Sequence, residues 1–317
     1  MSSVVWARRP AGAVTRLAGK ELLVLSARDL LEAAGREKLP LVALVAPSAA
    51  AMAGFARAAR DADAPLLLVR PSGAAEEKGP EEARDDAAFV QSAFKAAEEV
   101  HFTGPMALLK EPPRAGSAVP DRERVNREIE AGFTGMAVAA ADSQASARDA
   151  ALAAAAVCAL ELGLEVVPLG GALAAAELAR QLTSRGARPS AVRLTGMEDQ
   201  AGDLGIAVST ETESLAPRLV ASGVRQLVAS GPFLRALRRA APAALWDKLQ
   251  SWADEKGATL DQAAARHQRV LRDLPQEAQE RLEALCCFEA LELMNTARAS
   301  GSGARLVAAI AALHPAE

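Results

Sequence analysis

The sequence predicts an α/β protein of the (β/α)8 TIM-barrel class, with a helical extension at the C-terminal end. Eight short apolar segments alternate with helical segments at a spacing of about 25–30 residues, as in an eightfold barrel. Several of these segments are continuously apolar, which is typical of strands in a parallel sheet that are buried on both faces. A doubly wound open sheet is the alternative. Strict alternation carried to eight strands favours closure, and no Gly-x-Gly-x-x-Gly follows the first strand to indicate a dinucleotide fold.

Each element follows from a local pattern. The chain enters the fold through residues 21–36, a short start and a helix, with Ser26 as N-cap, Asp29 in the acidic first turn and Gly35 at the end. Apolar runs predict strands at 39–48, 64–72, 102–111, 135–142, 164–171, 190–196, 204–210 and 224–231. Helical patterns predict helices at 49–61, 87–99, 121–131, 146–162, 173–185, 212–222 and 232–240.

These elements divide the chain into three parts. Residues 1–20 are expected to form a flexible or loosely docked arm, since they contain no continuous apolar stretch of signal-peptide type. A transit-like arm is the weaker interpretation. Residues 21–242 form the barrel, and residues 243–317 form helices without strands that pack on the barrel or on a second subunit.

Composition narrows the possible partners. Lys and Arg total 36, Asp and Glu total 40, and no basic block stands out, so there is no electrostatic case for nucleic acid. No apolar run reaches the ~18–20 residues that a membrane helix needs. The three cysteines, Cys158, Cys286 and Cys287, are expected to be reduced and buried, which indicates a cytoplasmic protein.

Four segments are similar to sequences of the class II, zinc-dependent fructose-bisphosphate and tagatose-bisphosphate aldolases. Residues 23–69 resemble the opening of that family, and DRERVNREIEAGFTGMAVAAADS (121–143) resembles its third helix and fourth strand. ASGVRQLVASG (221–231) resembles its eighth strand, and RLEALCCFEALELMNTARASGSGARL (281–306) resembles its C-terminal helix. The resemblance implies a TIM barrel and, in its unmodified form, a zinc ion held by three histidines and a proton-shuttling aspartate.

The sequence departs from the family at the positions that carry this chemistry. The aspartate position falls near Glu111, and the neighbouring metal histidine falls near Pro112, which cannot ligate a metal. Ser209 and Thr210 stand where the family has a histidine and glycines in strand seven. The chain has three histidines, and no two of them are spaced as ligands: His101, His267 and His314. We therefore expect no zinc site of the family type and no other cofactor.

Active groups in such barrels lie at the C-terminal ends of the strands. Lys110 and Glu111 end the third predicted strand, and only one of the two can face the lumen. Lys110 could form a Schiff base with a carbonyl substrate, whereas Glu111 could replace the family's acid–base group. Asp142 could orient a substrate hydroxyl, and could equally cap the next helix. The remaining polar strand ends are Ser48, Arg70, Thr195, Ser209, Thr210, Ser230 and Gly231.

The last four of these residues suggest an anion site. Loops after strands seven and eight of many barrels hold phosphate on backbone N–H groups at a helix N-terminus. Ser209 and Thr210 end strand seven, and Ser230 and Gly231 end strand eight, with Pro232 next. Ordinary helix capping is the competing interpretation of these serine and threonine residues.

Three functions remain open. The first is a non-catalytic member of the aldolase family that acts as a partner subunit, a scaffold or a sensor of a phosphorylated sugar or another small anion, and forms a homodimer or larger homo-oligomer. The second is a metal-independent lyase for a phosphorylated sugar, using Lys110 or Glu111. The third is an interaction protein that uses an apolar stripe on the C-terminal helices, formed by Leu282, Leu285, Cys286 and Leu293.

Overall fold

The computed structural model describes residues 3–17, 21–71, 80–112, 122–140, 155–159, 162–168, 172–195, 205–210 and 216–315 of the 317-residue chain. The strands are β1 Leu23–Val24, β2 Leu41–Val45, β3 Leu66–Arg70, β4 Pro105–Lys110, β5 Gly135–Ala140, β6 Leu164–Pro168, β7 Ala191–Thr195, β8 Gly205–Thr210 and β9 Gln226–Ala229. None of the described helices is long and apolar enough to cross a membrane.

The helices lie between the strands and after them. The first group is α1 Ser3–Ala7, α2 Ala11–Leu17, α3 Ala27–Glu37, α4 Ala49–Asp61, α5 Pro80–Glu99, α6 Arg122–Ala131, α8 Ala172–Ser184, α9 Ala216–Ala221 and α10 Gly231–Ala240. The C-terminal group is α11 Ala243–Lys256, α12 Leu260–Arg266, α13 Gln268–Arg272, α14 Gln276–Thr296 and α15 Gly303–Leu313. Residues 155–159 are also helical.

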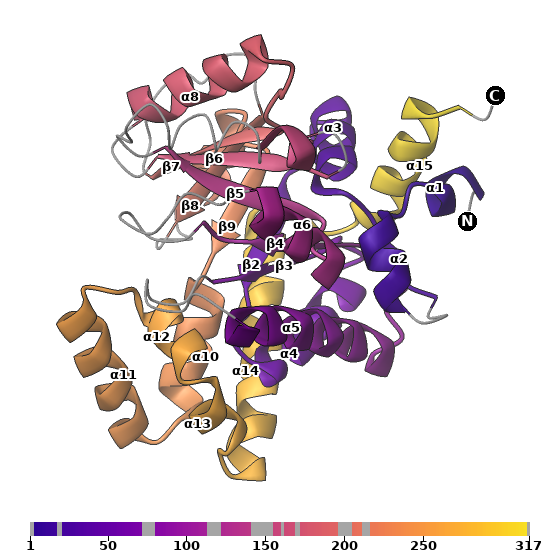
Figure 1. Ribbon diagram of the computed structural model, residues 1–317. Helices are drawn as coiled ribbons and strands as arrows, with labels where there is room; N and C mark the ends of the chain where they lie inside the picture. The colour runs from indigo at the N-terminus through magenta and orange to yellow at the C-terminus, as the bar shows by residue number, and fades with distance from the viewer. Residues whose placement is uncertain are drawn as a thin grey trace.

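Strands β2 to β9 form a closed ring, which confirms the predicted (β/α)8 barrel. Each strand pairs in parallel with the next one along the chain, and β9 pairs with β2 through Leu41↔Gln226 and its neighbours. The helices surround the strands, α11 to α14 lie together on one side, and α15 lies apart from them beside α1 (Figure 1). Each of the eight predicted strands therefore corresponds to one strand of the ring.

Strand β1 was not predicted, and it shares one edge of β4 with β5. It pairs with the first half of β4, through Leu23↔Pro105, while β5 pairs with the second half, through Leu109↔Gly135 and Lys110↔Met136. The chain after β1 stays between these strands, because the amide of Ala27 donates to the carbonyl of Thr134 at 2.8 Å. We call this narrow junction the β4–β5 seam.

Glycine is required at the seam. A Cβ atom on Gly135 would lie 2.6 Å from both Ala27 Cβ and Leu109 Cδ2, closer than real Cβ atoms approach other atoms. The start of α3 is thus pressed against the seam, which fixes this helix at the N-terminal end of the barrel. Ser26 caps α3, as predicted, by accepting a hydrogen bond from the amide of Asp29 at 3.0 Å.

The core has two layers because successive strand residues point to opposite faces. One layer fills the lumen with small and aliphatic side chains, including Leu41, Ala43, Val45, Leu67, Val69, Ala107, Leu109 and Val228. The other lies between strands and helices and contains the fully buried phenylalanines Phe55, Phe89, Phe94, Phe133 and Phe233. The phenylalanines of the core are thus concentrated where the helices cover the sheet.

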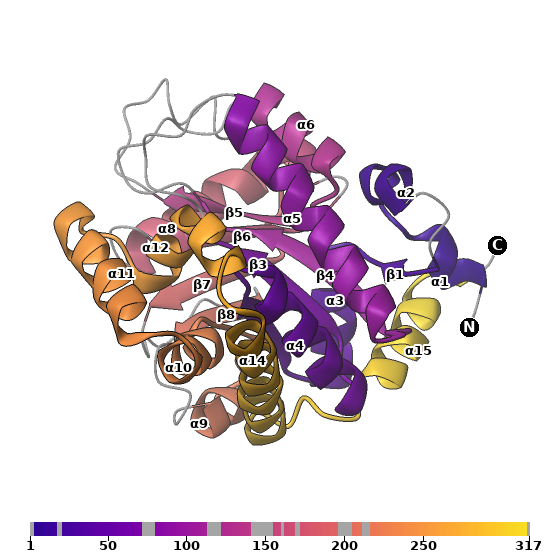
Figure 2. The same cartoon turned by 90° about the horizontal axis from the view of Figure 1, so that it is seen from below.

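The N-terminal residues 3–17, expected to form a flexible or loosely docked arm, contain two helices that contact the rest of the chain. They form α1 and α2, and Val5 and Ala13 are fully buried. Arg8 follows α1 and donates two hydrogen bonds to the carboxylate of Asp29, which is 1 % exposed. The helix α1 lies beside α15, so the two ends of the chain are close together (Figures 1 and 2).

The helix α14 packs along α4 and α10, as Figure 2 shows, and ties the C-terminal region to the barrel. Its stripe residues Leu282, Cys286 and Leu293 are buried in the same core as the barrel helices. Glu289 of α14 forms ion pairs with Arg235 and Arg239 of α10. The apolar stripe considered as a partner surface is therefore used for packing within the chain.

Candidate functional site

The end of β4 presents two charged side chains to opposite sides of the barrel wall. Lys110 points outward, where its Nζ lies 2.6 Å from Asp86 Oδ2 and 3.1 Å from Glu128 Oε1. Glu111, the next residue, accepts a hydrogen bond from Arg193 of β7 across the lumen. Of the two alternatives for the lumen side, the geometry thus selects Glu111 and places Lys110 among the helices.

Glu111 belongs to an ionic trio inside the barrel. Arg193 Nη1 lies 2.5 Å from Glu111 Oε1, and Arg193 Nη2 lies 2.5 Å from Glu165 Oε2 on β6. The side chains of Arg193 and Glu165 are each 3 % exposed, and that of Glu111 is 20 % exposed. Glu111 is therefore the member of the trio that solvent or a ligand can reach.

The trio perturbs the ionisation of its members. Burial raises the pKa of Glu111, the charge of Arg193 opposes this, and the nearby Glu165 and Asp261 raise it further. Burial alone would lower the pKa of Arg193, but the charges of Glu111 and Glu165 outweigh it and raise that pKa. Arg193 therefore stays cationic, and the raised pKa of Glu111 means that this carboxylate takes up a proton at a higher pH than an ordinary glutamate does.

The effect of Asp261 on the pKa of Glu111 shows which C-terminal element lies near the mouth of the barrel. Asp261 is in the first turn of α12, so this C-terminal helix lies close enough for its carboxylate to interact with Glu111. The extension after the barrel thus contributes charge to the surroundings of the lumen entrance.

A further polar side chain lies in the lumen. Gln226 begins β9 and is 1 % exposed, and it has the same orientation as Val228, which belongs to the lumen core. Neither amide atom of Gln226 has a hydrogen-bond partner among the described residues, and the same holds for Glu165 Oε1 and Arg193 Nε. Buried polar atoms are almost always hydrogen-bonded, so these atoms require water or a ligand.

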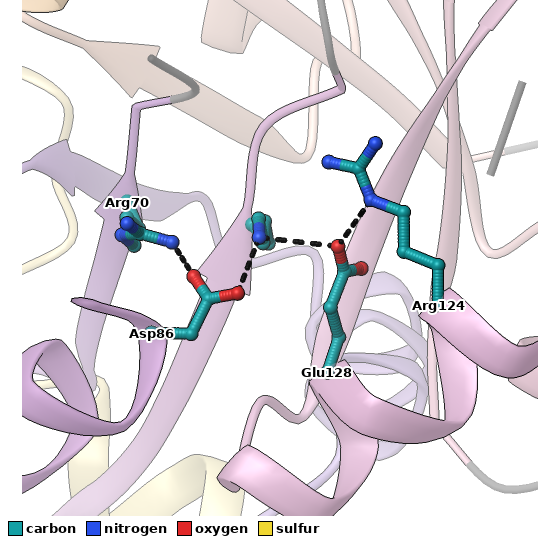
Figure 3. Close-up of polar contacts among 5 residues, drawn as sticks. Arg70, Asp86, Arg124 and Glu128 are labelled. Atoms are coloured by element: carbon teal, nitrogen blue, oxygen red, sulfur yellow. Dashed lines mark hydrogen bonds and ion pairs between the residues drawn. The ribbon is translucent and has the colours of Figure 1, made fainter. Parts of the chain in front are cut away.

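A second ionic cluster lies on the outer face of the wall, between β3, β4, α5 and α6. We call it the rim cluster; it consists of Arg70, Asp86, Lys110, Arg124 and Glu128. Arg70 pairs with Asp86, and Arg124 Nε lies 3.0 Å from Glu128 Oε1 (Figure 3). The Lys110 ammonium joins the two carboxylates and lies 5.8 Å from the centre of the Phe133 ring.

The remaining predicted residues have separate positions. Ser48 caps α4 by accepting from the amide of Ala51 at 3.2 Å, which is a structural role. Ser230 stands at the N-cap of α10 without a side-chain capping bond, and Gly231 is the first residue of that helix. Ser209 and Thr210 end β8 and pair with Val228 and Ala229, so the two predicted anion-binding strand ends are adjacent. Asp142 lies outside the described residues, and so does the side chain of Thr195.

Among the described residues, the end of β4 offers no histidine for the zinc ion that the sequence resemblance implies. It provides Lys110, Glu111 and Pro112, and proline has no donor atom for a metal. The three histidines lie on separate elements: His101 follows α5, His267 lies between α12 and α13, and His314 ends α15. Within the part of the chain that the structure describes, no group of three or more His, Cys, Asp or Glu residues could hold a metal.

Several site residues were missed in the sequence. Glu165, Arg193 and Gln226 were treated as parts of apolar strands, Glu128 as part of a helix, and Asp86 as a residue before the helix predicted at 87–99. The available signal was opposite charge within two strands expected to be buried on both faces, since isolated buried charges are rare and require partners. Nothing in the linear order indicates that Lys110 meets Asp86 and Glu128.

Comparison with known proteins identifies solved structures that have a similar fold. The sequence matches no protein family profile and no curated protein. The structure is similar to that of the YdjI aldolase from Escherichia coli K12, with a TM-score of 0.58 and 10 % identity over 88 % of this chain and 99 % of that one. It is also similar to a protein from Coccidioides immitis described as a candidate fructose-1,6-biphosphate aldolase, with a TM-score of 0.57 and 13 % identity over 88 % and 98 % of the two chains. These similarities establish the barrel fold that the two proteins share with this chain.

Proposed function

We propose that the protein is a class II aldolase-like barrel that binds a phosphorylated sugar or another small anion at its mouth without cleaving it. In this role it acts as a partner subunit, scaffold or sensor, as a homodimer or larger homo-oligomer. The observation that carries the proposal is the ion pair between Glu111 and Arg193. This ion pair engages Glu111, which stands near the position where the resemblance implies a proton-shuttling aspartate.

The surroundings support this interpretation. A proton shuttle must lie within hydrogen-bond reach of the substrate atom that it serves, at ~2.6–3.2 Å. Glu111 Oε1 is instead directed to Arg193 at 2.5 Å, and no metal-ligand group is present among the described residues to polarise a carbonyl. The overall fold is retained, as the similarity to two aldolase-type structures indicates. A barrel that keeps the fold but has Glu111 paired with Arg193 and no metal-ligand group among the described residues is suited to binding rather than to aldol cleavage.

The test compares binding with turnover. Purified protein would be assayed for cleavage of fructose 1,6-bisphosphate and tagatose 1,6-bisphosphate, after EDTA treatment and again with added zinc. Calorimetry with the same sugars would measure binding. We expect binding and no cleavage under either condition. Cleavage that depends on added zinc would contradict both the non-catalytic role and the absence of a zinc site.

One observation favours a second candidate, a metal-independent lyase. Burial raises the pKa of Glu111, which moves this carboxyl toward the range in which general acids and bases operate. Cleavage that persists in EDTA and disappears in Glu111→Gln would support the lyase. The Schiff-base route through Lys110 makes a separate prediction, because borohydride with a ketose phosphate would then trap an adduct on Lys110. We expect no adduct, since Asp86 and Glu128 hold this ammonium.

A further inference from the structure

Three buried polar side chains lie on neighbouring strands of the lumen wall. Glu165 is on β6, Arg193 is on β7 and Gln226 is on β9, with β8 between the last two (Figure 1). None of the three residues is more than 3 % exposed. Arg193 and Gln226 stand at the same level of the sheet, because both pair with Ala207 of β8. The three side chains therefore line one continuous part of the lumen.

Four atoms of these side chains have no hydrogen-bond partner among the described residues. Arg193 Nε and Gln226 Nε2 are donors, whereas Glu165 Oε1 and Gln226 Oε1 are acceptors. The ionic trio leaves these atoms unused, since Arg193 donates to Glu111 through Nη1 and to Glu165 Oε2 through Nη2. Buried polar atoms in folded proteins almost always have a partner, so this set indicates a bound group.

The apolar neighbours in the lumen do not provide that partner. Gln226 pairs in the sheet with Leu41 of β2, and Val228 is the next residue of β9 on the lumen side. The buried side chains of the lumen cluster are all aliphatic and have no hydrogen-bonding atoms. Within the part of the barrel that the structure describes, the partner is therefore a group from outside this cluster.

The orphaned atoms define the chemistry of this partner. Two donors and two acceptors complement an oxygen that carries a hydrogen, as in water or an alcohol. A bare anion would satisfy Arg193 Nε but not Glu165 Oε1, and a cation would do the opposite. Buried water typically makes about three hydrogen bonds, so about one or two oxygens would satisfy the set.

We propose that Gln226, Arg193 and Glu165 form a hydroxyl-binding site inside the barrel. Its oxygen comes from buried water or from a hydroxyl group of the sugar ligand; the second source rests on the proposed function, and the first does not. Gln226 is the residue that selects a hydroxyl, because its amide offers one donor group and one acceptor in either orientation. Arg193 and Glu165 are held in place by their own ion pair.

The first experiment counts buried water. Gln226→Met keeps a side chain of similar length and removes both orphaned amide atoms. Gln250→Met is the matched control, because the Gln250 amide bonds to Asp254 on the exposed face of α11. Oxygen-17 relaxation dispersion detects long-lived internal water, and circular dichroism checks that each variant is folded. We expect Gln226→Met to lose about one long-lived water that the unmodified protein and Gln250→Met retain. Gln226→Leu replaces Gln226→Met if that variant does not fold.

The second experiment tests the sugar hydroxyl as the source. Calorimetry with fructose 1-phosphate would compare the same two variants with the unmodified protein. If the ligand supplies the oxygen, Gln226→Met should weaken binding about fivefold or more, as expected for one lost hydrogen bond, and Gln250→Met should leave it unchanged. A loss of buried water or a loss of affinity in Gln226→Met alone supports the site. No change in either measurement would overturn the proposal.

The two experiments also separate this site from the proposed function. Loss of buried water in Gln226→Met, together with no fructose 1-phosphate binding by the unmodified protein, supports the site and contradicts the proposed function. Fructose 1-phosphate binding that is equal in both variants, with no change in buried water, does the reverse. A higher melting temperature of Gln226→Met, with no change in water or affinity, would show that the amide atoms are unsatisfied in the folded protein.

Discussion

Lys110 and Glu111 are adjacent in the chain, yet they belong to two different ionic clusters on opposite faces of the barrel wall. Lys110 meets Asp86 and Glu128 under the helices, while Glu111 meets Arg193 in the lumen. One strand end therefore connects the packing of α5 and α6 to the entrance of the barrel.

Replacing Lys110 should destabilise the protein. Lys110→Met removes the cation that Asp86 and Glu128 share and leaves them paired with Arg70 and Arg124, so we expect a loss of about 1–3 kcal/mol in the free energy of unfolding. Urea unfolding followed by circular dichroism would measure the loss. Lys95→Met is the control, because Lys95 is 73 % exposed and its pair with Glu99 should contribute ~0–1 kcal/mol. Equal effects of the two substitutions would refute the structural importance of the Lys110 pairs.

Arg193 should contribute to the stability of the fold through its charge rather than through the volume of its side chain. Arg193→Met leaves two carboxylates facing each other in the lumen, and we expect a loss of about 3–5 kcal/mol in the free energy of unfolding. Adding Glu111→Gln and Glu165→Gln to this variant removes the uncompensated charges and should restore most of the stability. Urea titration of the single and triple variants checks this. A triple variant as unstable as Arg193→Met would indicate that packing, not charge, is lost.

The raised pKa of Glu111 predicts a specific pH dependence. A carboxyl group whose pKa is higher in the folded protein stabilises the fold below its unfolded pKa of ~4.3, and this contribution is lost as pH rises through the folded pKa. Glu111→Gln mimics the protonated form, so its melting temperature should rise relative to that of the unmodified protein as pH increases from about 4 to 8. Thermal unfolding across this range measures the difference. A constant difference at all pH values would contradict the pKa shift.

Asp29 should hold the N-terminal helices in place. Asp29→Ala removes the acceptor of both hydrogen bonds from Arg8, and we expect trypsin to cleave after Arg8 and Arg16 several times faster. Glu32→Ala, on an exposed position of the same helix, keeps both hydrogen bonds and serves as the control. Mass spectrometry of short digests would identify the cleaved bonds. Identical cleavage rates would show that Asp29 does not secure these helices.

The sequence predicted the regular part of the fold well. Eight apolar runs correspond to β2–β9, because a continuous apolar segment of this length between helices has few alternatives. It did not predict β1, which has two residues, because its pairing with β4 depends on the finished barrel. The end of α3 was also misplaced. Gly35 lies inside the helix, where the side chain of Arg225 occupies the space of a Cβ, and Lys38 provides the left-handed C-cap.

The candidate site was predictable only in part. The position of Glu111 at a strand end followed from the order of elements, and its orientation relative to Lys110 was left open. Its partner Arg193 lies 82 residues away, and the partner of Lys110, Asp86, lies 24 residues away on a helix. Such pairs depend on which strands and helices become neighbours. Which elements become neighbours is decided when the barrel closes, and no local sequence pattern indicates it.

The β4–β5 seam has a consequence for how the barrel opens. Only Leu109↔Gly135 and Lys110↔Met136 join the two strands, whereas β3 and β4 share five residue pairs. Separating β4 from β5 breaks few backbone hydrogen bonds, as does separating β6 from β7, which also share two residue pairs. Amide hydrogens along these two junctions should therefore exchange with solvent through small opening events. The ring would then open at either of these junctions before it opens between β3 and β4.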